Sequence, residues 1–378
     1  MNIRVFFTNI LSPIFRILPI SKHKILFLCY YGSQYGCNPK YLSEYIVKTH
    51  PEWHVVWAFT EPERHSVKGV RKVRYMSLRY FYELCTSHVV ITNYRMLDHF
   101  KKREGQKYIQ TWHSSLRLKM IEKDVESTLK PNYIAMALND SKNIDILLSG
   151  CQKSTEIFEH CFWYDGEIMP SGTPRNDLFF DANAKGLISA VKNSLGIKEE
   201  EKVLLYAPTF RKDEGLQYYN VQYDLLQEKL QQKYGGHWKI LVRLHPHLLN
   251  HSAELLGQSP VIDVTRYDDI QELLLISDML LTDYSSLMFD FAPSLRPCLL
   301  YTPDLESYQR QDRQLYFQIE ELPFPICRTN EEIMHMIDTL NEKDYQQHIS
   351  SFMQEVGSFE DGQASERVVK RIEQWMKK

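Results

Sequence analysis

Short apolar runs alternate with segments of helical periodicity along most of this chain. In the N-terminal half, an apolar run over residues 25–29 precedes a loop with Gly32 and Gly36, and a helical pattern begins after Asn38 and Pro39. Further apolar runs at "WHVVWAFTE", "HVVITN" and "KYIQTWHSS" predict additional strands. Strands that alternate with helices form parallel sheets, so this half predicts an α/β domain.

The second half repeats this alternation without repeating the sequence. The runs "KVLLYAPTF", "WKILVRLHPH", "VIDVT", "DMLLTDYSS" and "PCLLYTPD" predict strands, with helical patterns such as "DIQELLLIS" between them. We therefore predict an α/β protein with two doubly wound, Rossmann-like domains. The N-terminal domain covers residues 25–180, a helical linker covers 181–201, and the C-terminal domain with its final helices covers 202–378.

The first 24 residues have a different pattern. They carry four basic residues and no acid, and their apolar residues fall on one helical face. Asn9, Pro13 and Arg16 interrupt the apolar stretch that a spanning helix requires, and no small-residue cleavage site follows. Residues 1–24 therefore predict a basic amphipathic segment on an anionic membrane surface; the alternative is a helix that packs on its own domain. The predicted membrane contacts are Arg4, Phe7, Ile14 and Arg16.

Composition narrows the function classes. The chain has 378 residues with 43% hydrophobic and 25% charged residues, which is ordinary for a globular protein. A formal net charge of −3 argues against nucleic acid as a partner. Seven scattered cysteines without a C-x-x-C pair disfavour a disulfide framework and a cysteine zinc site, and they favour a reducing compartment.

Polar clusters follow several predicted strands, where open α/β sheets bind their ligands. His113 follows the strand "YIQT", and an imidazole there can accept a proton from an attacking hydroxyl. A structural, hydrogen-bonded histidine is the equal alternative. In "SGTPRND", Arg175 offers a planar guanidinium suited to phosphate, or it forms an ion pair that braces the domain edge.

Three clusters in the second half carry groups that suit an anion. Thr209 and Arg211 follow one strand, and Arg243 and His245 follow the next, although Arg243 is equally compatible with a buried brace. In "TDYSS", Ser285 and Ser286 stand at the start of a predicted helix, where they bind an anion or simply cap the helix. Asp283 is placed to orient a neighbouring histidine or arginine. The chain has no P-loop or G-x-G-x-x-G motif, yet the combined set predicts a cleft for a diphosphate.

The ordered motifs "QTWHSSLRLKMIEKD", "SGTPRNDLF", "YAPTFR", "RLHPH", "DVTRYDDIQELLLISDMLLTDYSSLMFDF" and "DGQAS" resemble the CDP-glycerol glycerophosphotransferase family of teichoic-acid primases and polymerases. The resemblance runs from about residue 25 to about residue 370. It implies a glycosyltransferase-B-type architecture that binds the CDP donor mainly on the C-terminal domain. It also implies a lipid-diphosphate-linked acceptor and a peripheral location on the cytoplasmic face of the bacterial membrane.

The same resemblance implies roles for individual residues. His113 is similar to the family's proposed catalytic base, and His245 to the histidine that assists at the donor phosphates. Asp283 matches the aspartate of the T-D-Y-S-S motif, as a third catalytic residue. The matched donor-binding residues are Arg175, Thr209, Arg211, Arg243, Ser285 and Ser286. One departure is Ser114, which stands where the family usually has glycine and bears on the choice of acceptor.

The expected reaction transfers glycerol phosphate from CDP-glycerol to an acceptor hydroxyl and releases CMP. We predict no tightly bound cofactor or metal; divalent-metal dependence and oligomeric state stay open. The compact size favours a primase over a polymerase. The alternatives are a CDP-ribitol or other CDP-polyol donor, a sugar transferase that uses a UDP-sugar on the same fold, and a non-catalytic nucleotide-binding protein.

Overall fold

The computed structural model describes residues 12–377 except 99, 212–215, 258–259 and 312–313. The chain divides into two compact units. The first unit contains the described residues up to Ser115, with Ile121–Phe180 and Phe359–Lys378. The second unit contains Leu116–Met120 and Asp181–Ser358.

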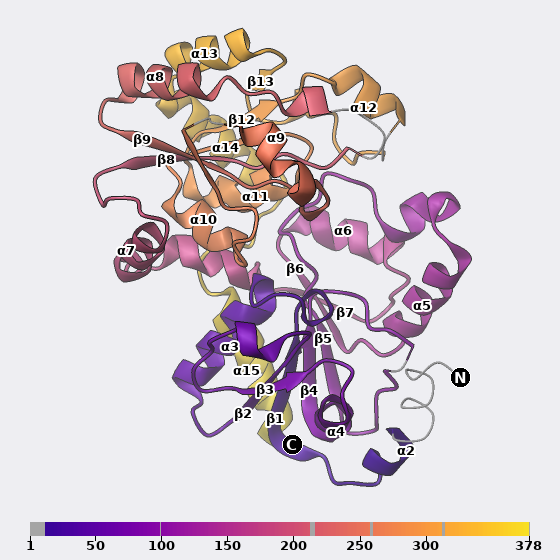
Figure 1. Ribbon diagram of the computed structural model, residues 1–378. Helices are drawn as coiled ribbons and strands as arrows, with labels where there is room; N and C mark the ends of the chain where they lie inside the picture. The colour runs from indigo at the N-terminus through magenta and orange to yellow at the C-terminus, as the bar shows by residue number, and fades with distance from the viewer. Residues whose placement is uncertain (1–11, 99, 212–215, 258–259, 312–313, 378) are drawn as a thin grey trace. The chain divides into compact units, whose positions relative to one another are not determined.

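The first unit is built on a parallel sheet of seven strands in the order β3-β2-β1-β4-β5-β6-β7 (Figure 1). Its strands are β1 (Ser21–Leu28), β2 (His54–Phe59), β3 (Arg71–Arg74), β4 (Ser87–Thr92), β5 (Lys107–Gln110), β6 (Ile146–Ser149) and β7 (Glu167–Pro170). Its helices are α2 (Ser12–Phe15), α3 (Cys37–Thr49), α4 (Leu78–Thr86), α5 (Pro131–Ser141), α6 (Gln152–Cys161) and α15 (Ala364–Lys377). Strands β1, β2 and β4 contain continuous buried apolar runs, as expected where helices cover both faces of a sheet, whereas only Val73 is buried in the edge strand β3.

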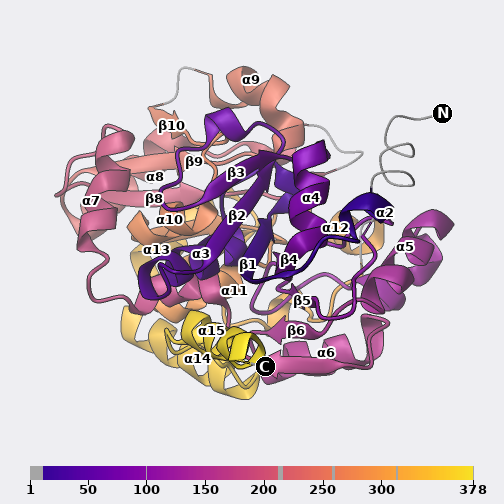
Figure 2. The same cartoon turned by 90° about the horizontal axis from the view of Figure 1, so that it is seen from below.

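One face of this sheet packs against α3 and α15. Leu42 and Ile46 of α3 join Val368 and Ile372 of α15 in one buried cluster with the odd-numbered residues of β1 and β2. Figure 2 shows α4 on the face opposite to α3. The last helix of the chain therefore completes the first core, although we had predicted its residues as part of the C-terminal domain over 202–378.

The second unit is built on a parallel sheet of six strands in the order β10-β9-β8-β11-β12-β13. Its strands are β8 (Lys202–Tyr206), β9 (Trp238–Val242), β10 (Val261–Asp263), β11 (Met279–Thr282), β12 (Cys298–Tyr301) and β13 (Ile326–Cys327). Its helices are α7 (Lys185–Ser194), α8 (Tyr223–Tyr234), α9 (Ser252–Leu256), α10 (Ile270–Ile276), α11 (Leu287–Phe291), α12 (Leu305–Gln311), α13 (Asn330–Thr339) and α14 (Glu342–Glu355).

Helices α8 and α13 lie together on one face of the second sheet, where Leu226, Leu230, Ile333 and Ile337 enter the core (Figure 1). Helix α7, in the predicted linker 181–201, packs against α10 and belongs to the second unit. The strands with predicted site residues, β8, β9 and β11, are direct neighbours in this sheet. The parallel arrangement therefore brings their carboxyl ends to one edge.

The seven cysteines are all buried free thiols. Within the described part of the chain, no helix combines the length and the apolar character needed to cross a bilayer.

Candidate active site

Arg211 is the centre of a buried ion cluster in the second unit. Its Nη1 atom donates to the Asp283 carboxylate at 2.6 Å, and its Nε and Nη2 atoms donate to Asp304 at 2.7 and 3.0 Å. The residue is 3% exposed. Burial alone lowers the pKa of Arg211, but the two carboxylates outweigh it and raise the pKa above its ordinary value. Arg211 is therefore a fully compensated cation within this unit.

Asp283 connects Arg211 to the loop after β8. Its two carboxylate oxygens accept the Thr209 backbone N–H at 2.8 and 2.9 Å, and the Thr209 carbonyl accepts from Arg211 Nη1 at 2.8 Å. Asp283 thus orients an arginine, one of the two functions considered for it from the sequence. Sequence reasoning missed Asp304, which follows β12 and whose position after a strand was the available signal.

Tyr284 extends this cluster toward α12. Its hydroxyl donates to Asp304 at 2.9 Å, and its ring stacks on Tyr308 with the centroids 3.6 Å apart and the planes at 12°. The Lys119 ammonium lies 5.4 Å from the Tyr308 ring centroid. Lys119 comes from the segment 116–120, which is remote in sequence, so no local pattern linked it to the second sheet.

His245 is an exposed residue after β9, next to the rings of Phe210 and His247. Its Nδ1 atom accepts the His247 backbone N–H at 3.3 Å. Partial burial, followed by His247 and Lys119, lowers the pKa of His245, which favours a neutral ring at neutral pH. In that neutral ring the proton is on Nε2, which can donate to a phosphate oxygen.

Ser285 and Ser286 lie before α11, a helix of only five residues. The Ser285 hydroxyl oxygen accepts the Leu287 N–H at 3.3 Å, and the Ser286 hydroxyl oxygen accepts the Leu118 N–H at 3.0 Å. A hydroxyl that accepts through a lone pair still has its O–H to donate. Both serine hydroxyls therefore accept a backbone N–H. The bond of Ser286 also holds the segment 116–120 in the second unit.

Arg243 follows β9 at the same sheet edge, and its Nη2 atom makes a long contact of 3.5 Å with the Asp268 carbonyl. Its backbone N–H donates to the Tyr206 carbonyl at 2.9 Å, which continues the pairing of β8 and β9. The second unit thus gathers Thr209, Arg211, Arg243, His245, Asp283, Ser285 and Ser286 at the ends of three neighbouring strands.

His113 lies in the first unit, in the loop after β5, and is partly buried. Its ring packs against Trp112 and Tyr94, with centroids 4.6 and 6.0 Å away and interplanar angles of 28° and 24°, and the Tyr30 ring lies 5.9 Å away at 56°. Its Nδ1 atom is 3.3 Å from the Asn93 carbonyl oxygen, so a neutral ring donates from Nδ1. That tautomer places the lone pair on Nε2, which is what a general base requires.

Arg175 also lies in the first unit, in the 3₁₀ segment Pro174–Phe180. It is 4% exposed, its Nη1 atom is 3.3 Å from the Cys37 sulfur, and its backbone N–H donates to the Asn38 side chain at 3.2 Å. The other matched donor-binding residues belong to the second unit. For Arg175, donor binding therefore rests on the sequence resemblance alone.

Asp177, which the sequence paired with Arg175 as an alternative, caps α15 instead. Its two carboxylate oxygens accept the backbone N–H groups of Ala364 and Ser365 at 2.9 and 2.7 Å. Arg367 of α15 donates to the Ser171 carbonyl at 2.8 Å. The motifs "SGTPRND" and "DGQAS" therefore fasten the C-terminal helix to the first unit.

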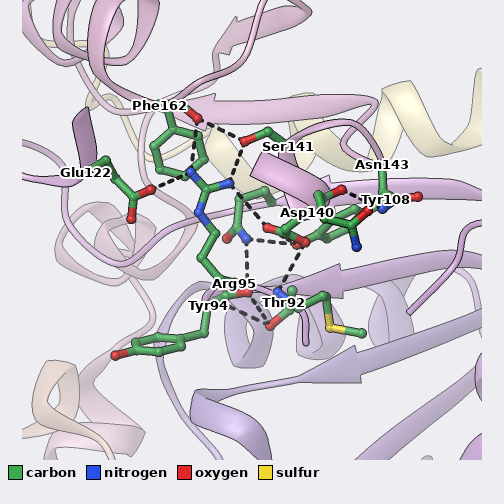
Figure 3. Close-up of polar contacts among 12 residues, drawn as sticks. Thr92, Tyr94, Arg95, Tyr108, Glu122, Asp140, Ser141, Asn143 and Phe162 are labelled. Atoms are coloured by element: carbon green, nitrogen blue, oxygen red, sulfur yellow. Dashed lines mark hydrogen bonds and ion pairs between the residues drawn. The ribbon is translucent and has the colours of Figure 1, made fainter. Parts of the chain in front are cut away.

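A second buried ion cluster surrounds Arg95, which follows Tyr94 (Figure 3). Arg95 donates to Glu122 at 2.8 Å and to Asp140 at 3.3 Å, and its guanidinium stacks 3.7 Å from the Phe162 ring centroid. Burial raises the pKa of Asp140 to about 6, although Arg95 and the hydrogen bonds from Met96 and Tyr108 lower it. The cluster fixes the chain immediately after Tyr94.

Among the residues that the structure describes, no group of three or more His, Cys, Asp or Glu side chains is placed to hold a metal ion.

Two parallel-sheet units with reactive side chains at their strand ends define an α/β protein of the glycosyltransferase-B type. The chain belongs to the CDP-Glycerol:Poly(glycerophosphate) glycerophosphotransferase family, whose model matches residues 10–374. This finding confirms the family that the ordered sequence motifs indicated.

Two relatives differ in how much of their length the chain spans. It is 32% identical over 368 residues to the teichoic acid poly(glycerol phosphate) polymerase of Bacillus subtilis (strain 168), covering 94% of this chain but 49% of that protein. It is 31% identical over 390 residues to the enzyme of the same name from Bacillus spizizenii, covering 98% of both.

A similar solved structure is that of the wall teichoic acid polymerase TagF, a histidine-to-asparagine variant soaked with CDPG. It matches with a TM-score of 0.86 at 30% identity, over 100% of this chain and 95% of that chain. This confirms the predicted glycosyltransferase-B-type architecture.

Proposed function

We propose that the chain transfers glycerol phosphate from CDP-glycerol to a hydroxyl of a membrane lipid-diphosphate-linked saccharide and releases CMP. The observation that carries the proposal is the setting of His113, whose Nδ1 contact with the Asn93 carbonyl favours the tautomer with the lone pair on Nε2. The hydroxyl oxygen bonds to the β-phosphorus, and its proton passes to His113 Nε2. The bond from that phosphorus to the CMP oxygen breaks, and CMP keeps the electron pair.

The second unit supplies the groups that stabilise charge on the diphosphate. His245 donates from Nε2, the hydroxyls of Ser285 and Ser286 add donors, and Lys119 adds a positive charge. Arg211 acts indirectly, since Asp283 and Asp304 already neutralise it while it fixes the Thr209 loop. Phosphoryl transfer depends mainly on positioning and electrostatics, so a set of fixed donors is sufficient in principle.

A donor panel tests the substrate class. CDP-glycerol, CDP-ribitol and UDP-sugars are each incubated with a synthetic lipid-linked disaccharide, and CMP or UDP release is measured. We expect the fastest release of CMP from CDP-glycerol. Faster turnover of CDP-ribitol or a UDP-sugar would replace the proposed donor, and no nucleotide release from any donor would favour a non-catalytic nucleotide-binding protein.

The number of additions needs a separate test. Size favoured a primase, but a polymerase relative of nearly equal length removes size as an argument. Mass spectrometry of the product made from the synthetic disaccharide and CDP-glycerol distinguishes the two. A product with one glycerol phosphate supports the predicted primase, whereas a ladder of longer products supports a polymerase.

We also propose that residues 1–24 hold the protein at the cytoplasmic membrane face. Arg4 and Phe7 lie outside the described residues. In the described part, Ile14 and Ile17 are 54% and 83% exposed, while Phe15 packs edge-on against Tyr82. The Arg16 guanidinium donates to the Lys101 carbonyl, which gives this predicted membrane contact an internal partner.

Vesicle flotation tests the membrane proposal. The chain without residues 1–20 should stay in solution with anionic vesicles, whereas the full chain should float with them. Flotation of both proteins to the same extent would show that another surface binds the membrane.

A further inference from the structure

Gln110 is a buried amide at the carboxyl end of β5, two residues before Trp112. Its Nε2 atom donates to the Tyr94 carbonyl and to the Tyr108 hydroxyl, both at 2.9 Å. Its Oε1 atom accepts the Trp112 backbone N–H at 3.0 Å. The side chain is 0% exposed, and both of its donors and its acceptor are used.

These hydrogen bonds hold two of the residues whose rings pack against His113. Trp112 has a φ of 49°, a left-handed conformation that residues with a side chain rarely adopt, so its backbone needs support from its surroundings. Gln110 binds the Trp112 N–H on one side and the Tyr94 carbonyl on the other. The rings of Trp112 and Tyr94 both pack against the His113 imidazole, as does the ring of Tyr30.

The contact that sets the His113 tautomer lies in the same loop. The Asn93 carbonyl, 3.3 Å from His113 Nδ1, immediately precedes Tyr94. A shift of the Tyr94 backbone therefore moves the oxygen that selects the Nδ1–H tautomer. A shift of Trp112 moves the imidazole itself, because the two residues are adjacent in the chain.

The ion cluster in Figure 3 supports this loop from its other side. Arg95, next to Tyr94, is held by Glu122 and Asp140, and the Asp140 carboxylate accepts the Met96 N–H at 3.1 Å. Residues 94–96 are thus fixed to α5, while Gln110 fixes Tyr94 to β5. An apolar side chain at position 110 would pack in the sheet without making any of these connections.

We propose that Gln110 is a positioning residue for the proposed base, holding Tyr94 and Trp112 so that His113 Nε2 keeps its lone pair and its direction. The inference rests on the proposed function of His113. It adds a residue that touches neither donor nor acceptor and acts only through the loop it supports.

The chain offers a matched control at the other end of the same strand. Gln106 precedes β5 and is 3% exposed. Its Nε2 atom donates to the carbonyls of Leu84 and Ser87 at 2.8 and 2.7 Å, and its Oε1 atom accepts the Arg103 N–H at 3.0 Å. Gln106→Met therefore removes an equivalent set of hydrogen bonds without touching the His113 loop.

The test compares Gln110→Met and Gln106→Met in full-length protein, with CDP-glycerol and the synthetic lipid-linked disaccharide. For Gln110→Met we expect kcat per folded molecule to fall by about 10- to 100-fold, because small misplacements of reacting groups cost this much, with KM for CDP-glycerol within about 2-fold. For Gln106→Met we expect an unchanged kcat. Equal kcat values for the two variants would overturn the inference.

Two further measurements secure the result. If Gln110→Met does not fold, Gln110→Glu keeps the volume and the acceptor but lacks the two N–H donors, and it should show the same fall in kcat. Nitrogen-15 NMR of the imidazole should show the Nδ1–H tautomer in the wild type and in Gln106→Met, and a mixture in Gln110→Met. A wild-type tautomer in Gln110→Met would contradict the inference.

Comparison of His113→Ala with Gln110→Met tests the proposed base and the role of Gln110 separately. A His113→Ala protein with normal turnover would remove the base, and with it the reason to position it. An inactive His113→Ala protein together with a fully active Gln110→Met protein would remove only the role of Gln110.

Discussion

Arg211 and His245, both predicted to bind the donor phosphates, differ in burial and in hydrogen-bond partners. Arg211 is buried between Asp283 and Asp304, and its guanidinium binds these carboxylates and the Thr209 carbonyl. His245 is exposed, and its Nδ1 accepts a backbone N–H, so the proton of the neutral ring is on Nε2. At the residue scale, Arg211 therefore fixes the Thr209 loop, while we propose that His245 contacts the donor.

Replacement of Arg211 by Met should chiefly affect stability. It leaves two buried carboxylates without their cation, and breaking a buried ion pair in this way costs about 3–5 kcal/mol. Denaturant unfolding measures the loss, with the exposed Arg328→Met as a control expected to stay within about 0.5 kcal/mol of wild type. Normal stability with a selective loss of CDP-glycerol affinity would identify Arg211 as a direct phosphate ligand instead.

Asp140 should make stability depend on pH. The pKa of this carboxyl is raised by burial to about 6 in the folded chain, against about 3.9 in an unfolded one, so the folded state holds its proton more tightly. Its contribution is fully present below pH ~4 and is lost as the pH rises through about 6, at about 1.4 kcal/mol per pKa unit.

Denaturant midpoints of wild type and Asp140→Asn between pH 4 and pH 7 test this dependence. The variant cannot ionise at position 140, so its midpoint should fall less over this range than that of the wild type. The exposed Asp165→Asn protein serves as the control and should follow the wild type. Parallel curves for all three proteins would refute the assignment to Asp140.

At the scale of elements, the segment 116–120 is the least expected part of the structure. It follows the His113 loop in sequence but belongs to the second unit, where the Leu118 N–H donates to Ser286 and the Tyr316 N–H donates to the Leu118 carbonyl. The five residues bring Lys119 to the Tyr284–Tyr308 stack. Lys119 thus adds a positive charge to the second unit, in which Asp283 and Asp304 already neutralise Arg211.

Lys119→Met should weaken CDP-glycerol binding by about tenfold, which corresponds to ~1.4 kcal/mol for one lost charged contact. Calorimetric titration measures the dissociation constant, and the difference from wild type should shrink at high salt. The exposed Lys123→Met protein is the control and should bind normally. Equal affinities of Lys119→Met and wild type would exclude Lys119 from the donor site.

Apolar runs predicted most of the strands because each buried strand is determined by a few neighbouring residues. Residues 25–29 predicted β1, and the strand ends carrying His113, His245 and Ser285 were identified in the same way. Pairings between distant residues were not visible. Asp304 opposite Arg211, Asp177 at the start of α15 and Lys119 beside Tyr308 depend on three-dimensional packing, on which local periodicity carries no information.

At the scale of the whole molecule, the proposed reaction uses residues of both units. We propose that His113 of the first unit, held by Asn93 and Gln110, is the base, and that the second unit binds the diphosphate at the ends of β8, β9 and β11. The chain passes between the units more than once. The segment 116–120 belongs to the second unit although the residues on both sides of it belong to the first, and α15 belongs to the first unit although it follows the second in sequence. Neither unit is therefore a single continuous stretch of sequence.

The most direct test of this proposal measures CDP-glycerol binding and glycerol-phosphate transfer in the same His113→Ala protein. We predict that transfer falls by about 10²–10⁴-fold, as expected for the loss of one general base, while the dissociation constant for CDP-glycerol stays at the wild-type value. Near-normal transfer, or a loss of donor affinity that accounts for the whole loss of rate, would contradict the account.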